Sequence, residues 1–184
     1  MRFGFILLLL FSLSACAPHH DLPFLGQVPA FEMTAQDGKP FRSESLAGHV
    51  WVADFIFTNC PGPCLRMSSQ MKKVQTATAG SPEIRMLSFS IDPERDTPAV
   101  LTAFASRYGA DHTRWFFLNG PLPTLQMLSR DTFKLGDVDG TVNHSTRFVL
   151  VDKRGRVRGI YRTQDEDPAG KVAADALQLQ KENS

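Results

Sequence analysis

The most regular feature of the chain is an alternation of apolar runs with amphipathic segments. The run from Trp51 to Phe57 is almost continuously apolar, which is typical of a strand covered on both faces, and Ile84 to Ile91 has a similar character. The segment between these runs repeats apolar residues at a spacing that fits one buried helical stripe: Leu65, Met67, Met71 and Val74. Strand, helix and strand in this order predict two parallel strands joined by a right-handed crossover.

A second helix is marked by its end signals. Thr97 is a good N-cap, Pro98 suits the first helical position, and Gly109 ends the helix. Shorter runs and turn residues predict the other elements: a hairpin from Phe31 to Phe41 around Asp37-Gly38, a helical turn from Ser43 to Gly48, a strand from Trp115 to Leu118, a helix from Pro121 to Thr132, a hairpin of Ser145 to Val151 with Arg156 to Tyr161, and a closing helix from Pro168 to Gln180.

This order of elements predicts an α/β fold with a central mixed sheet, helices on both faces and an N-terminal hairpin. The composition agrees with one such domain plus a tail, because 184 residues that are 42% hydrophobic can bury a full core. The formal net charge is +1, and Arg2 is the only charged residue among the first fifteen. The rest of the chain is therefore neutral, which gives no support to a nucleic-acid partner.

The N-terminus has the pattern of an export signal. Arg2 provides the positive start, Phe3 to Leu13 the apolar run, and Leu13-Ser14-Ala15-Cys16 the small-residue cleavage site. The apolar run is too short to favour a resident transmembrane helix. The last four residues resemble the lipobox of bacterial lipoproteins, which implies cleavage before Cys16 and acylation of its thiol. A plain secretory signal with an incidental cysteine is the alternative.

These signals predict a division into a signal peptide over residues 1–15, a membrane tether over residues 16–28 and a domain over residues 29–184. Either kind of signal places the domain outside the cytoplasm, where disulfides are permitted. The expected location is the bacterial cell envelope, with a lipid anchor and the domain facing the periplasm or another extracytoplasmic space.

Two cysteines remain if Cys16 carries lipid, and they stand together as Cys60-Pro-Gly-Pro-Cys64 between the first long strand and a helix. A disulfide this short would restrict the unfolded chain little, so stapling is a poor reason for the pair. A helix N-terminus favours thiolate, which helps both metal binding and disulfide exchange. The pair at the end of a strand makes the plan thioredoxin-like, with Cys60 and Cys64 as a redox pair, metal ligands or both.

His144, in Asn143-His144-Ser145, is the candidate for a third ligand. It directly precedes a core strand, in a loop that faces the thiols in a thioredoxin-like plan. The other histidines are His19 and His20 in the tether, His49 before a strand, and His112 in a polar turn. Two thiolates with an imidazole suit Cu(I) and tolerate Cu(II), zinc would need a fourth ligand or water, and magnesium or calcium would need oxygen donors. A loop histidine that bonds the backbone is the alternative.

Several other polar or soft residues have structural explanations. Asp54 interrupts the apolar run, and we expect it at a sheet edge or in an internal pair, with a catalytic role as the alternative. Asp92, Glu94 and Asp96 precede a helix N-terminus, where acidic residues are favourable. A surface that docks a partner is the alternative role for them. Met67 and Met71 have the spacing of core residues rather than of copper ligands.

Three separated segments of the chain resemble the Sco/SenC family: Phe55-Ile-Phe-Thr-Asn-Cys-Pro-Gly-Pro-Cys64, Ser90-Ile-Asp-Pro-Glu-Arg-Asp-Thr-Pro98, and Asn143-His-Ser145 followed by Phe148-Val-Leu-Val-Asp152. The resemblance implies a thioredoxin-like fold and copper, as Cu(I) or Cu(II), bound by Cys60, Cys64 and His144. It also implies delivery of copper to the CuA centre of cytochrome c oxidase, in subunit II, or reduction of the thiols of that centre. Another copper acceptor and a periplasmic thiol reductant are further expected partners.

The chain departs from the family pattern at two positions. Many members have proline after the second cysteine where this chain has Leu65, and aspartate before the histidine where it has Asn143. Neither change removes a ligand, although loss of the acid could weaken the orientation of the imidazole. A thiol-disulfide oxidoreductase or thiol peroxidase on the same fold is the alternative, and a copper- or redox-sensing module is a third possibility.

Overall fold

The computed structural model describes residues 21–138 and 145–182. The predictions that concern the export signal, Cys16 and His144 therefore lie outside the described residues. Among the residues that are described, no helix combines the length and the apolar character needed to cross a membrane.

A single eight-stranded sheet forms the centre of the domain, in the order β1-β8-β7-β4-β5-β6-β2-β3. Its three central parallel strands are β4 (Trp51–Ile56), β5 (Arg85–Ser90) and β6 (Trp115–Asn119). The flanking strands are antiparallel to their neighbours: β1 (Gly26–Gln27), β2 (Glu32–Ala35), β3 (Pro40–Arg42), β7 (Arg147–Val151) and β8 (Arg156–Arg162). The mixed sheet and its parallel pair are confirmed.

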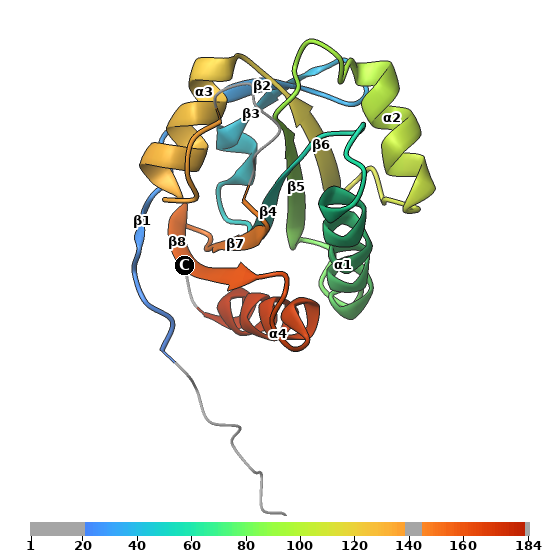
Figure 1. The fold of residues 1–184 in the computed structure, drawn as a ribbon. Coiled ribbons are helices and arrows are strands. Elements are labelled where there is room, and N and C mark those ends of the chain that lie inside the picture. Colours follow the sequence, from blue (N-terminus) through green and yellow to red (C-terminus); the bar gives the residue numbers. More distant parts are fainter. Residues whose placement is uncertain (1–20, 139–144, 183–184) are drawn as a thin grey trace, which may run out of the picture.

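Helices cover both faces of this sheet. Asp54, Ser88 and Phe117 are neighbours across three strands and so share one face. On this face, Phe104 of α2 (Pro98–Arg107) packs edge-on against Phe117, and α1 (Pro63–Ala77) packs beside α4 (Pro168–Lys181), as Figure 1 shows.

The other face is covered mainly by the segment that follows β6. This segment contains α3 (Leu122–Gln126) and the π-helical turn η2 (Met127–Thr132); the 3-10 turn η1 (Ser43–Leu46) comes earlier in the chain, between β3 and β4. Phe133, next to η2, packs edge-on against Trp51 and Phe55, whose side chains alternate with that of Asp54. A single helix was predicted from Pro121 to Thr132, but its second half widens into i→i−5 bonding, with the Phe133 amide donating to the Leu128 carbonyl at 2.9 Å.

The packed domain begins earlier than residue 29, the boundary that the sequence suggested. Leu22 is buried, and β1, inside the predicted tether, pairs with β8 through Gly26 opposite Val157. Arg158 fastens the preceding turn, with its guanidinium donating to the Leu22 carbonyl at 2.8 Å and to the Pro23 carbonyl at 3.0 Å.

Candidate functional site: a buried thiol pair at the end of the central strand

The two cysteines lie at the carboxyl end of β4, where the chain turns into α1. No disulfide joins the two sulfurs, and both residues are buried, with Cys60 6% exposed and Cys64 fully enclosed. The backbone amide of Cys64 points at the Cys60 sulfur at 3.4 Å. The structure thus brings the predicted pair together in its reduced form.

The local sequence explains why the helix starts at the pair. Pro63 occupies the first helical position, where its missing amide donor costs nothing, and the N-cap residue Gly62 has no side chain to offer. The Cys60 sulfur takes the place of the usual capping oxygen, since it accepts from the backbone amide of Cys64, the second residue of the helix. The positive end of the helix dipole therefore lies beside this sulfur.

Asp96 holds the loop that carries the thiols. Its buried carboxylate accepts hydrogen bonds from the Thr58 amide at 3.1 Å, from the Thr58 hydroxyl at 2.5 Å and from the Ser90 hydroxyl at 2.6 Å. Asn119 in turn donates to the Asp96 carbonyl at 2.7 Å. Asp96 therefore connects the ends of β4, β5 and β6 two residues before Cys60.

This role of Asp96 was missed by the sequence analysis, which considered only the acid-rich helix N-terminus or a partner surface. Part of that interpretation holds for its neighbours, because Asp92 forms an ion pair with Arg95 at 3.1 Å and Glu94 is exposed. The signal that could have revealed Asp96 is its place in the loop between the central strand β5 and α2, at the carboxyl end of the sheet, where loops from parallel neighbours meet.

Asp54 is neither at a sheet edge nor in an internal pair, so both expectations for it were wrong. It lies on the central strand β4, fully buried, and neither of its carboxyl oxygens has a hydrogen-bond partner among the described residues. Burial raises the pKa of Asp54 to about 7, with the nearby Ser88 hydroxyl opposing the rise. The neutral acid is the form that this site accommodates best.

The Cys64 thiol is held in its protonated form by its surroundings. Burial is the main cause that raises its pKa well above the ordinary value, and the neighbouring Cys60 side chain and the carboxyl of Asp54 act in the same direction. The Phe57 backbone opposes the shift. Any reaction that uses Cys64 as a thiolate must therefore remove a proton from a buried group.

The described histidines do not lie near the thiols. His49 precedes β4 and His112 precedes β6, which places both at the amino ends of parallel strands, opposite to the thiol end. His49 contacts the Glu83 carbonyl through Nδ1 at 2.9 Å. Within residues 21–138 and 145–182, no group of three or more His, Cys, Asp or Glu side chains could hold a metal ion.

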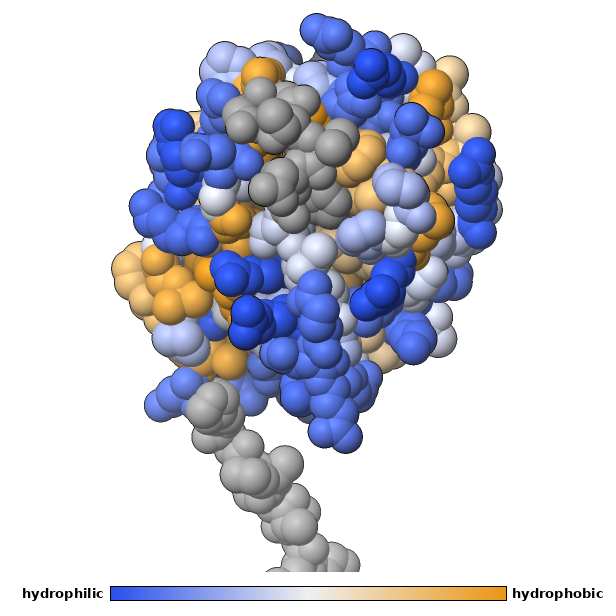
Figure 2. All heavy atoms as spheres, in the orientation of Figure 1, coloured by the Kyte–Doolittle hydropathy of each residue, from blue (hydrophilic) through white to orange (hydrophobic). Residues whose placement is uncertain are grey.

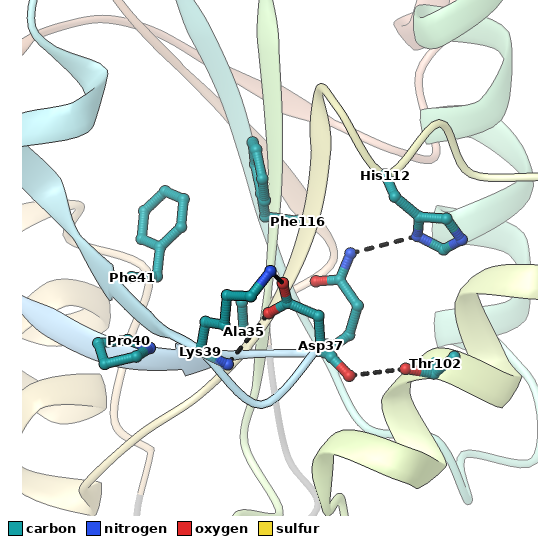
Figure 3. A pocket seen from close by; sticks show the side chains of 9 residues that line it. Ala35, Asp37, Lys39, Pro40, Phe41, Thr102, His112 and Phe116 are labelled. Atoms are coloured by element: carbon teal, nitrogen blue, oxygen red, sulfur yellow. Dashed lines mark hydrogen bonds and ion pairs between the residues drawn. The ribbon is translucent and has the colours of Figure 1, made fainter.

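His112 instead belongs to a pocket of about 410 Å³ between the β2–β3 turn, α2 and β6 (Figure 3). There its Nδ1 lies 3.4 Å from the amide nitrogen of Gln36, whose carbonyl accepts from the Thr102 hydroxyl at 2.6 Å. This partly buried polar contact engages His112 away from the thiols, in the polar turn where the sequence analysis placed it.

The end of the sheet at which β7 begins is the thiol end. Val149 lies opposite Ala53 in the antiparallel pair of β7 and β4, so Ser145, four residues earlier, is level with the residues just after β4. Ser145 is the first described residue after the gap at 139–144. Ser145 therefore lies at the same end of the sheet as Cys60 and Cys64.

The other residues near the thiol pair are either buried in the core or exposed around the pair. Met67 and Met71 are buried, as expected for core residues, whereas Leu65 is 41% exposed. Tyr108, at the end of α2, reaches across so that its hydroxyl lies 3.5 Å from the Leu65 carbonyl, and burial raises its pKa. The thiol pair therefore has a partly apolar rim formed by the first turns of α1 and the end of α2.

Comparison with known proteins decides the family of this chain. The SCO1/SenC family model matches residues 25–179. The chain belongs to the SCO1/SenC family. The SCO1 protein homolog of Bacillus subtilis is 35% identical over 159 residues, which cover 83% of this chain and 82% of that protein.

Two solved members of the SCO1/SenC family share the fold with a TM-score of 0.76 each. A SCO1/SenC family lipoprotein from Bacillus anthracis is 35% identical, with 85% of this chain and 96% of that chain covered. BsSco, in which a disulfide switch was identified and which belongs to the Sco family of cytochrome c oxidase assembly proteins, is 33% identical, with 88% and 99% covered. Sco proteins solved with copper bound, at 20–24% identity, share the fold alone. The thioredoxin-like plan is confirmed.

Proposed function

We propose that this protein is a membrane-tethered copper chaperone of the bacterial cell envelope. In this proposal Cys60, Cys64 and His144 hold one copper ion, and the CuA centre of cytochrome c oxidase receives it. The single observation that carries the proposal is a reduced, buried thiol pair at a helix N-terminus, in a chain of the SCO1/SenC family.

The chemistry of the pair supports copper as the cargo. Two sulfurs from positions 60 and 64 form a soft donor set in a largely apolar setting, which favours Cu(I) over zinc and excludes ions that need oxygen ligands. Within the described residues, no cluster of three His, Cys, Asp or Glu side chains adds a third donor to the pair. His144 directly precedes Ser145, at the thiol end of the sheet, and is the residue that we propose for it.

Transfer would proceed by ligand exchange, in which thiolates of the acceptor replace Cys60 and Cys64 one at a time. Oxidation of the pair to a disulfide would remove both sulfur ligands, so an external thiol reductant has to keep it reduced outside the cytoplasm. The lipid on Cys16 would keep the domain near its membrane-bound acceptor, as the description of the Bacillus anthracis relative as a lipoprotein supports.

Anaerobic titration of the reduced protein with Cu(I) tests the ligand set. We expect one copper ion per chain, and we expect Cys60→Ser and Cys64→Ser to lose binding. His144→Ala should weaken binding at least about 100-fold, because it removes one residue that coordinates the metal directly. His112→Ala is the matched control, because it removes an imidazole at the opposite end of the sheet. Equal affinity of His144→Ala and the wild type would overturn the ligand assignment.

A thiol-disulfide oxidoreductase is the second candidate, and one observation favours it. The relative BsSco, which is 33% identical to this chain, has a disulfide switch. The two functions differ in their need for the imidazole. Disulfide reduction that persists in His144→Ala, by a wild type that retains no copper, would favour the oxidoreductase.

A further inference from the structure

The two helices that border the thiol pair carry basic side chains and no acidic ones. Neither α1 nor α2 contains an Asp or Glu, whereas the two helices together contain four basic residues: Arg66, Lys72, Lys73 and Arg107. The whole chain has a formal net charge of only +1. Positive charge is therefore concentrated on these two helices and balanced elsewhere in the chain.

Most of these basic side chains have no acidic partner. Arg66, Lys73 and Arg107 are exposed, and none of them forms an ion pair among the described residues. In the loop before α2, Asp96 is buried and Asp92 pairs with Arg95, which leaves Glu94 as the exposed acid without an ion pair in that loop. The basic side chains of the two helices are thus available to an acidic partner.

The end of α2 is fixed against α1. The Gly109 carbonyl, just after α2, accepts hydrogen bonds from the Lys72 ammonium group at 2.8 Å and from the Gln75 amide at 3.2 Å. Figure 1 shows the two helices next to each other on the right of the sheet. The surface that they share is therefore already formed in the free protein.

Tyr108 places this shared surface beside the thiols. Its hydroxyl lies 3.5 Å from the carbonyl of Leu65, the residue that directly follows Cys64. Burial is the main cause that raises the pKa of Tyr108, and both thiol side chains act in the same direction, whereas Arg107 opposes them. The Tyr108 hydroxyl thus lies within electrostatic range of the thiols and of Arg107.

Apolar side chains are exposed among the basic ones. Leu65 on α1 is 41% exposed, and Val100 on α2 is 38% exposed. Along the right margin of Figure 2, where Figure 1 places α2, hydrophilic and apolar side chains lie side by side. Arginine and tyrosine next to apolar side chains are the residue types that protein–protein interfaces favour.

We propose that this surface docks the copper acceptor through acidic side chains that lie beside the acceptor's metal-binding thiolates. The docking surface, here called the α1–α2 rim, consists of Leu65, Arg66, Arg107 and Tyr108. The inference rests on the proposed function and names the surface that the function uses. An arginine guanidinium binds a carboxylate through two parallel hydrogen bonds, which gives the contact direction as well as strength.

The position of the rim makes contact with the acceptor unavoidable. Ligand exchange requires the acceptor's thiolates to reach Cys60 and Cys64, and the rim begins at the residue after Cys64. An interface of standard size covers about 800 Å² on each partner, far more than the thiols themselves. An acceptor site whose thiols are deprotonated carries negative charge, so the positive rim also attracts it before contact.

The test measures how fast the acceptor associates with the chain. Full-length chain in detergent, reduced and loaded with Cu(I), binds the immobilised copper-free CuA domain of cytochrome c oxidase subunit II at low and at physiological ionic strength. We expect the double variant Arg66→Gln/Arg107→Gln to associate about ten-fold more slowly at low ionic strength, and to lose most of the salt dependence of the wild type. Its affinity for Cu(I) should be unchanged, because neither arginine is a ligand.

Arg154→Gln is the matched control. Arg154 is also exposed and without an ion pair among the described residues, but its turn lies at the amino end of β4, because Val151 is opposite Trp51. This variant should associate like the wild type, and Arg66→Lys/Arg107→Lys should recover part of the lost rate, since it restores the charge without the bidentate contact. Equal association of wild type and double Gln variant, or equal slowing by Arg154→Gln, would overturn the proposal.

Two other occupants of the rim are outcomes of the same set of variants. Self-association of the wild type that the double Gln variant loses would assign the rim to a second copy of the chain. Binding to anionic vesicles that depends on the two arginines would assign it to a membrane. Either result, with acceptor binding unchanged, would overturn the proposal.

The experiment separates this inference from the proposed function. A wild type that binds copper and the CuA domain, with a double Gln variant that docks equally well, would refute the α1–α2 rim alone. A wild type that binds no copper, yet docks through the two arginines, would refute the proposed cargo and keep the rim. A wild type that binds copper but not the CuA domain would refute the proposed acceptor and the rim together.

Discussion

Two buried aspartates flank the thiol loop, and the chain treats them in opposite ways. Asp96 accepts hydrogen bonds from Thr58 and Ser90 and is 1% exposed. Asp54 is equally buried on β4 but has no hydrogen-bond partner among the described residues. A carboxylate that accepts hydrogen bonds fixes the geometry of the loop. A buried carboxyl group without such bonds lowers the free energy of unfolding, and does so more when it is ionised than when it is protonated.

The difference between Asp96 and Asp54 explains how the thiol end of the sheet can have a rigid backbone and reactive side chains. Asp96 joins three strand ends, so the backbone just before Cys60 is held in place. Asp54 and Cys64 lie deeper and disfavour negative charge, because burial raises the pKa of each. A soft cation that replaces the thiol proton would relieve this constraint without moving the loop.

Removal of Asp96 should have the largest effect on stability. Asp96→Ala leaves the Thr58 amide and the Ser90 hydroxyl without their acceptor, so we expect the free energy of unfolding to fall by about 3 kcal/mol. Denaturant unfolding of the reduced protein measures the change. Glu94→Ala is the control from the same loop, since Glu94 is exposed and should cost less than about 0.5 kcal/mol. Similar losses in both variants would show that Asp96 does not hold the loop.

Asp54 should have the next effect, with the opposite sign. Its pKa of about 7 in the folded protein exceeds the ordinary value of 3.8, so the folded state binds more protons between these values. The stability of the reduced, copper-free wild type therefore falls as pH rises from about 4 to about 7, and stays low above that range. Asp54→Asn cannot ionise and should escape this loss.

The measurement compares Asp54→Asn with the wild type at two pH values. The advantage of the variant in free energy of unfolding should be on the order of 2 kcal/mol larger at pH 8 than at pH 5. Asp165→Asn, at an exposed position, controls for charge removal at the surface. A difference between variant and wild type that does not change with pH would show that Asp54 ionises at its ordinary pKa.

The copper affinity should depend on pH through Cys64. Burial raises the pKa of this thiol, so it is protonated at neutral pH and has to lose its proton when it binds copper. The apparent Kd for Cu(I) should then fall about ten-fold per pH unit for each proton displaced. Competition titrations between pH 6 and pH 8 measure the slope. A flat profile would mean that Cys64 is no ligand, or that it is already a thiolate.

The strands and the thiol turn around the two aspartates could be predicted from the sequence, but the contrast between the aspartates could not. The apolar runs predicted the central strands and their parallel pairing, and the spacing of Cys60 and Cys64 predicted thiols at a helix start. The pattern did not reveal whether Asp54 has a partner, because an acid within an apolar run looks the same in both cases. The contact of Asp96 with Thr58 joins residues 38 positions apart, which only the pairing of β4 with β5 brings together.

The smallest effect is expected at the rim of the site, at Leu65, where the resemblance to the family predicts proline in many members. Leu65 is exposed at the third position of α1, and the first amides of a helix have no acceptor within the helix. Leu65→Pro, the family residue, should therefore change the free energy of unfolding by less than about 1 kcal/mol.

Copper affinity should also stay the same in Leu65→Pro, because the Cys64 amide that points at the Cys60 sulfur is retained. Thermal unfolding and Cu(I) competition measure both properties, and Leu65→Ala controls for loss of the side chain. If proline alone weakened copper binding, the first turn of α1 would have to move when the metal binds. In that case the loop held by Asp96 would stay in place when copper binds, and the first turn of α1 would move.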